Sequence, residues 1–151
     1  MADADIAQQT LVEHGMLKHI TDALRLAIGW ELKDGDVQRK LSTVRFIARC
    51  LQRHLEHLFA LEEHDGYMDA VLRHGPHLSK RVSALRQEHD QFRQALPRLV
   101  GRLEQLSPTD PMALGSVCDD LLALLQRLDE HSRQEANLRQ EALAREGGGE
   151  G

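Results

Sequence analysis

Apolar residues recur every three or four positions along almost the whole chain, with charged and polar residues between them. This spacing predicts amphipathic helices that bury one face. Residues that break helices divide the pattern into long segments at about 4–28, 36–64, 76–105 and 111–146, with a short piece at 67–75. Pro97 is expected to kink the third long helix, and Asp110 with Pro111 to begin the fourth as cap and first residue. Short connections between long helices favour an all-α, up-down-up-down antiparallel four-helix bundle.

Length and composition agree with one helical domain. The 151 residues are predicted to form a single domain over 1–146, followed by a flexible, glycine-rich tail at 147–151. Aromatic residues make up only 3% of the chain, so leucine must supply most of the core. A net charge of -5, with both signs interleaved, gives no basic surface for nucleic acid. The sequence has no signal peptide and no apolar stretch long enough for a membrane span, which predicts a cytoplasmic protein.

Each predicted apolar face contains one histidine, and the last also contains a glutamate. The histidines are His14, His54, His89 and His131, and the glutamate is Glu135. The face of the first helix is predicted to consist of Ala7, Leu11, His14, Leu17, Thr21, Leu24 and Ile28. A buried polar group without a partner costs about 1–3 kcal/mol, against a total stability of about 5–15 kcal/mol. Four imidazoles and a carboxylate in a leucine core therefore require partners.

The positions of these histidines along their helices provide a second argument. His14 and His54 lie at similar distances from the first predicted loop, as His89 and His131 do from the second. Antiparallel neighbours at equal distances from their loop lie level, so all four rings are predicted within one or two helical turns of a common layer. This arrangement is typical of a metal site inside a bundle.

The motifs around these residues resemble those of a known family. EHDQF in the third helix, HSRQE in the fourth and HLEHLFALEEHDGYM at the end of the second are similar to the hemerythrin-like (HHE cation-binding) domains, over about residues 10–145. The resemblance implies a hemerythrin-like bundle holding a non-haem di-iron centre. It also implies a role in binding or sensing oxygen, nitric oxide, peroxide or iron.

The second helix departs from the pattern. The symmetry that pairs His54 with His131 pairs Glu135 with Leu58, which cannot bridge two ions. Glu62, one turn further along, is the candidate replacement, and its alternative is an ion-pairing role near the helix end. His57 is the second choice for a histidine ligand, whereas Glu63 is predicted to face solvent.

The predicted metal ligands are therefore His14, His54, Glu62, His89, His131 and Glu135. Imidazole and carboxylate suit iron, and zinc is the alternative ion. Three functions remain open. The first is a binder or sensor of a diatomic gas or small oxidant, which predicts a dry, leucine-lined pocket and requires an unidentified protein partner. The second is an enzyme acting on peroxide or nitric oxide, and the third is a metal-free helical interaction module.

Overall fold

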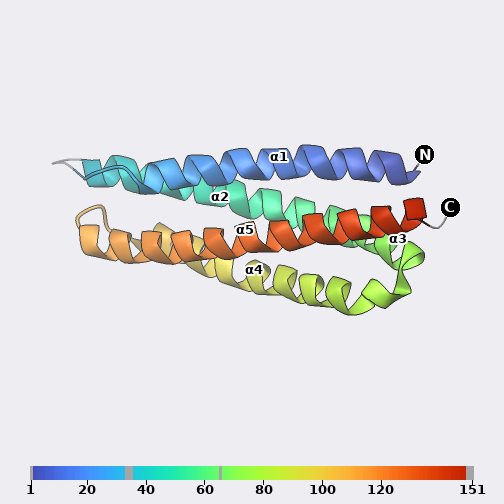
Figure 1. Ribbon diagram of the computed structural model, residues 1–151. Coiled ribbons are helices and arrows are strands. Elements are labelled where there is room, and N and C mark those ends of the chain that lie inside the picture. Colours follow the sequence, from blue (N-terminus) through green and yellow to red (C-terminus); the bar gives the residue numbers. More distant parts are fainter. Residues whose placement is uncertain (1, 33–35, 65, 149–151) are drawn as a thin grey trace.

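The computed structural model describes residues 2–32, 36–64 and 66–148. The described residues form helices and no strand, which confirms the all-α prediction. The elements are α1 (Ala2–Ile28), α2 (Asp36–Glu63), α3 (Tyr67–His74), the 3₁₀ turn η1 (Pro76–Leu78), α4 (Ser79–Gln105) and α5 (Pro111–Gly148). The four long helices run up and down alternately, so α1 begins and α5 ends at the same end of the bundle (Figure 1). Helix α3 crosses this end and joins α2 to α4.

Helix ends agree with the sequence in most places. The Asp110 side chain accepts a hydrogen bond from the backbone N–H of Ala113 at 3.0 Å, so it caps α5 as predicted. Helix α4 continues without a break through Pro97. Helix α5 extends to Gly148, two residues into the predicted tail, and residues 149–151 lie outside the described part of the chain.

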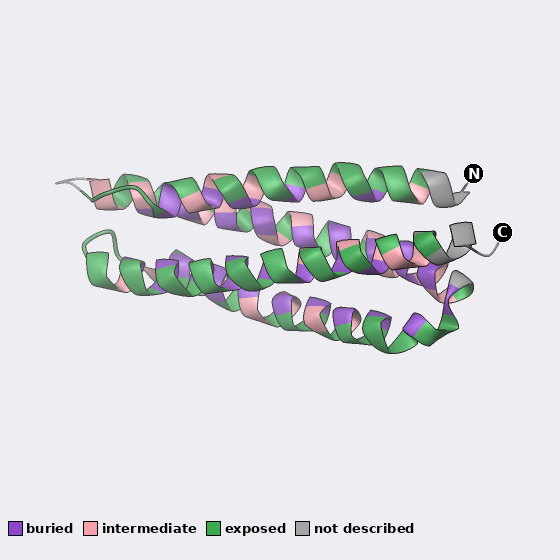
Figure 2. Cartoon of the chain, viewed as in Figure 1, coloured by how far each residue is buried: buried purple, intermediate pink, exposed green. Residues whose placement is uncertain are grey.

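The core lies along the axis of the bundle, and buried positions recur on the inward faces of all four long helices (Figure 2). The predicted faces of the third and fourth helices are buried from Val82 to Leu103 and from Leu114 to Leu138. The predicted face of the first helix is wrong at its N-terminal end. Leu11 is 69% exposed, and Thr10 is buried in its place. Both residues lie three or four positions before His14, so spacing alone does not distinguish them.

A tight turn after α2 sets the position of α3. A Cβ atom on Gly66 would lie 2.0 Å from the carbonyl oxygen of Leu61 and 2.7 Å from that of Glu62. Only glycine allows this close approach of two backbone segments. The turn lets α3 begin at Tyr67, and Tyr67 and Met68 then pack in a second apolar cluster at this end of the bundle. Among the described residues, no helix is both long and apolar enough to cross a membrane.

Candidate metal centre

Five of the predicted ligands meet between the helices. Two groups of side chains each have ligand atoms within 4.8 Å of one another, and Glu135 belongs to both. One group is His89, His131 and Glu135, and the other is His14, Glu62 and Glu135. Four of the five side chains are at most 1% exposed, whereas His14 is 15% exposed. The arrangement is two adjacent donor sets that share a carboxylate.

The inward-facing atoms of this cluster lack ordinary partners. Four of them are buried without a hydrogen bond: Glu62 Oε1, His89 Nε2, His131 Nε2 and Glu135 Oε1. His131 Nε2 lies 2.9 Å from Glu135 Oε1, and Glu62 lies 3.6 Å from His89 and 3.3 Å from His14. Two ligands bound to one ion at about 2.1 Å are separated by about 3.0–3.4 Å. The spacing and the missing hydrogen bonds therefore both fit a metal ion between these atoms.

The outer nitrogens of the two buried histidines are hydrogen-bonded. His89 Nδ1 lies 2.7 Å from Glu63, and His131 Nδ1 lies 2.8 Å from Glu88. With these carboxylates as acceptors, each Nδ1 carries a proton, which leaves Nε2 as the nitrogen that would face a metal ion, as in metal-bound histidines. Burial opposes protonation of His131, but the adjacent carboxyls of Glu135 and Glu88 raise its pKa, so in the metal-free protein its imidazolium form is favoured relative to that of a free histidine. The prediction that Glu63 faces solvent is wrong, because Arg93 also binds it and draws it against the bundle.

Two rings also fix the plane of His89. Phe59 stacks on it, with ring centroids 3.9 Å apart and an angle of 13° between the planes. The His131 ring lies 4.9 Å from His89 on another side. Burial lowers the pKa of His89 despite the nearby carboxylates, so this imidazole is neutral at pH 7 and retains its lone pair.

The two inner carboxyls share a low-dielectric site. Burial, followed by the neighbouring Glu135, raises the pKa of Glu62 well above its usual range. Burial opposes ionisation of Glu135 too, but the close contacts with Glu62 and His131 and the hydrogen bond from Tyr67 hold its pKa below the usual range. Without a metal ion, the pair therefore keeps one proton, and Glu62 holds it. Cations bound between the carboxyls would allow both to ionise.

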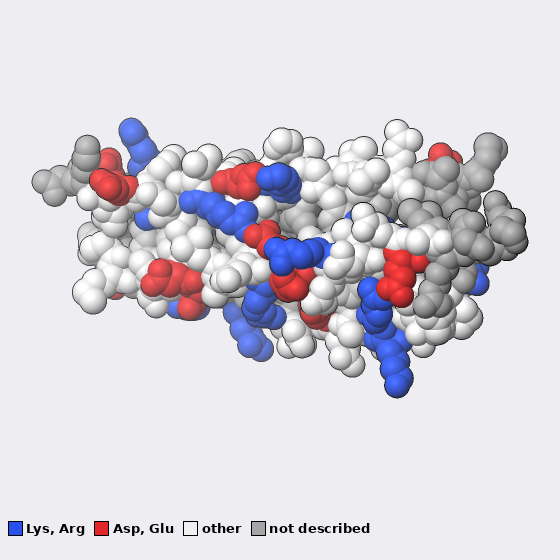
Figure 3. Space-filling model, in the orientation of Figure 1, with Lys and Arg blue, Asp and Glu red and all other residues white. Residues whose placement is uncertain are grey.

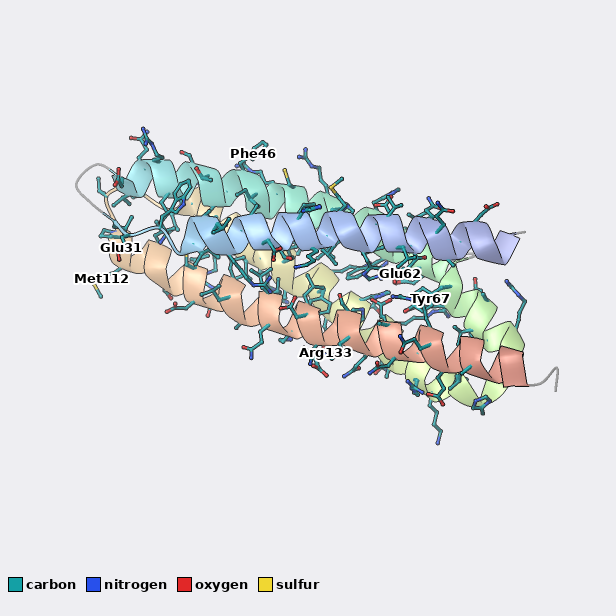
Figure 4. The ribbon with its side chains drawn as sticks, turned by 45° about the horizontal axis from the view of Figure 1, so that its top comes forward. Glu31, Phe46, Glu62, Tyr67, Met112 and Arg133 are labelled. Carbon is teal, nitrogen blue, oxygen red and sulfur yellow. The ribbon has the colours of Figure 1, made fainter. Side chains whose placement is uncertain are left out.

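Tyr67 is a site residue that helix periodicity did not identify. Its hydroxyl donates a hydrogen bond to Glu135 Oε2, and the residue is 4% exposed. It lies beside Glu62 in the space between the helices (Figure 4). Tyr67 belongs to the short α3, so it is not part of the apolar face of any of the four long helices. The signal in the sequence is Gly66 immediately before it, where a forced turn directs the next side chain inward.

The structure does not bring His54 into either donor set. Its Nε2 makes a 2.9 Å hydrogen bond with the backbone carbonyl of Glu13, and the side chain is 10% exposed. His57 points outward, with 58% of its side chain exposed. Leu58 is buried in the core, and Glu62 supplies the carboxylate that Leu58 lacks. The ligand role of His54 stays a prediction from the sequence alone.

Comparison with known protein families identifies the family of the chain. The family model described as the hemerythrin HHE cation binding domain matches residues 5–143. The chain belongs to the hemerythrin family. Searches of curated proteins and of solved structures gave no match. As a hemerythrin domain, the chain is a cation-binding four-helix protein, and its buried histidines and glutamates form groups suited to hold the cation.

Proposed function

We propose that this hemerythrin domain holds two non-haem iron ions and binds or senses oxygen, nitric oxide, redox state or iron supply. The observation that carries the proposal is the pair of donor sets sharing Glu135, with four inward-facing atoms that make no hydrogen bond. His89, His131 and Glu135 would hold one ion, and His14, Glu62 and Glu135 the other. Bound iron supplies redox chemistry and reversible coordination of small molecules.

The donor types favour iron over zinc. Two histidines and one carboxylate are typical of non-haem iron sites that keep open positions, and bridging carboxylates in a four-helix bundle are typical of di-iron proteins. Zinc remains the alternative ion, because nitrogen and oxygen ligands also suit it. In either case, Glu63 and Glu88 orient the imidazoles, and Tyr67 holds one oxygen of Glu135 by donating its proton to a hydrogen bond.

The alternative function is an enzyme that acts on peroxide or nitric oxide. Two observations favour it. Tyr67 places a hydroxyl inside the site, and the cavity that reaches His14 is lined by charged and hydroxyl side chains in addition to Leu17 and Leu128. However, burial and the charges of Glu135 and Glu62 raise the pKa of Tyr67, so Tyr67 is a hydrogen-bond donor and a poor acid. For this reason binding or sensing is the preferred function.

The metal-free interaction module is the least supported function. The structure leaves four inward-facing polar atoms buried without a hydrogen bond, and a buried polar group without a partner costs about 1–3 kcal/mol, which a bound metal ion would remove. A sensor of this size still requires a protein partner to transmit its signal, and we assign none.

The test is metal content by elemental analysis of protein purified without chelators, with a near-ultraviolet absorption spectrum of the same sample. We expect about two irons per chain, as in other di-iron bundles, and about one or fewer after Glu135→Gln. His57→Gln is the matched control, because this exposed histidine should leave the iron content unchanged. A wild-type protein that takes up neither iron nor zinc would disprove the proposal.

Catalysis is tested separately on the iron-loaded protein. Consumption of peroxide or nitric oxide over many equivalents would establish the enzyme and reject a purely binding role. A spectral change that saturates at about one equivalent of ligand per centre, without turnover, would establish the binder.

A further inference from the structure

A polar groove between α1 and α5 reaches the candidate metal centre. It encloses about 420 Å³, and His14 forms part of its wall. The remainder of the wall includes Thr21 and Asp22 from α1, with Ser132 and Arg139 from α5. Blue and red side chains gather along this seam in Figure 3. The groove therefore reaches His14, the most exposed histidine of the cluster.

The charges in the groove do not cancel. Lys18 pairs with Asp22 at 3.3 Å, and Arg25 pairs with Asp129 at 2.6 Å. Arg139 is the third cation in the wall, and no third carboxylate lines the groove among the described residues. Within the wall, the positive charge of Arg139 therefore has no carboxylate partner.

Arg139 is held in a defined position. Its guanidinium carbon lies 5.1 Å from the centre of the Tyr67 ring, within the range of a cation–π contact. Its Nη1 is buried and makes no hydrogen bond. The positive charge acts on both His14 and Glu62. A buried guanidinium N–H without an acceptor, beside a polar groove, indicates that an acceptor is supplied from outside.

We propose that the inner end of this groove binds a small planar oxyanion with one negative charge, such as nitrite or formate, held by Arg139 beside His14. The planar guanidinium matches a planar oxyanion, and charge-assisted hydrogen bonds are about twice as strong as neutral ones. A positive charge without a partner in the groove wall attracts an anion. The inference rests on the proposed function, since it assigns a ligand class to that site.

The test uses metal-free protein, so that it does not depend on iron loading. Sodium nitrite is titrated while the backbone N–H signals of Ser132 and of position 139 are followed by NMR, since both are present in every variant, with sodium formate and sodium chloride as further titrants. Arg139→Gln removes the proposed partner. Ala136→Leu fills the groove from α5 and leaves the arginine in place. Arg133→Gln is the matched control on the same helix, because that side chain is 69% exposed and points away from the groove (Figure 4).

We expect a saturable shift of these signals with nitrite and with formate, and an affinity for chloride at least about tenfold lower. Arg139→Gln and Ala136→Leu should each lower the affinity for nitrite at least about tenfold. Arg133→Gln should bind within about twofold of wild type. Equal binding by wild type and Arg139→Gln, or equal loss in both arginine variants, would overturn the inference. Nitrite binding in a protein that takes up no iron would reject the proposed function alone. Iron uptake without nitrite binding would reject this inference alone.

Discussion

Replacement of Glu62 by glutamine should change stability in opposite directions with and without metal. In the metal-free protein, Glu62 is 1% exposed, its Oε1 has no hydrogen bond, and its pKa is raised by burial and by Glu135. The wild-type carboxyl must therefore take up a proton to fold. This uptake costs about 1.4 kcal/mol for each pH unit above the unfolded pKa of about 4.5, up to the folded pKa. Glutamine has the shape of the protonated acid and does not pay this cost.

The sign and size follow from that difference. Because the folded pKa of Glu62 is raised, wild-type stability is lost as pH rises from the unfolded pKa towards the folded one. At pH 7 the metal-free variant should be more stable by about 1–3 kcal/mol, or about 3–9 °C in melting temperature. At pH 5 the gain should fall below about 1 kcal/mol. With excess metal the wild-type protein should be the more stable of the two, because it binds the metal more tightly than the variant, which lacks the Glu62 carboxylate. A ligand that binds only the folded state adds about 2.7 kcal/mol to stability at one hundred times its Kd.

The assay is thermal unfolding by circular dichroism in chelator, and again in excess iron or zinc. Glu104→Gln is the control: this glutamate is 48% exposed and pairs with Arg49, so its loss should matter by less than about 0.5 kcal/mol in both conditions. A Glu62→Gln protein that melts below wild type in chelator would refute the argument, because the carboxylate would then be stabilised by the fold itself.

Three further predictions concern the support of the site. Glu88→Gln removes the ionised acceptor of His131 Nδ1 and should weaken metal affinity about 10–100-fold with little change in metal-free stability, as measured by competition with a coloured chelator. Tyr67→Phe leaves a buried carboxylate oxygen without its donor, so we expect about tenfold weaker metal retention; unchanged retention would show that the hydroxyl has no part in the site. Gly66→Ala forces the turn apart and should lower the free energy of unfolding, measured with denaturant, by at least about 2 kcal/mol. The control is Gly15→Ala, where an added Cβ meets no atom within 4 Å; it should be neutral or stabilise the protein by up to about 1 kcal/mol.

Sequence periodicity predicted the faces of α4 and α5 well because both are long helices with a continuous apolar row. His89, His131 and Glu135 belong to these rows, and the structure buries all three. On α1 the same rule failed at Leu11, since steps of three and four residues both keep a side chain near one face. Hydrophobicity then suggested the wrong residue, and packing against the other helices decided between them.

Residues near the end of α2 could not be placed from periodicity, because contacts with other elements decide their direction. Glu63 turns inward because His89 and Arg93, both on α4, bind its carboxylate. Tyr67 enters the site only because the chain turns sharply at Gly66. Neither contact is encoded in the period of a single helix.

One feature of α2 links the departures from the expected ligand set. The symmetry of the two halves predicts a carboxylate at Leu58, level with Glu135, yet the chain supplies it one turn later, at Glu62. One turn is about 5.4 Å along the helix, so the donor set moves towards the end that α3 crosses. At that end Tyr67 donates a hydrogen bond to the shared carboxylate of Glu135, while His54 bonds the backbone of α1 instead. Glu62→Leu alone should weaken metal binding. Adding Leu58→Glu to that variant should restore metal binding only when His54 is intact.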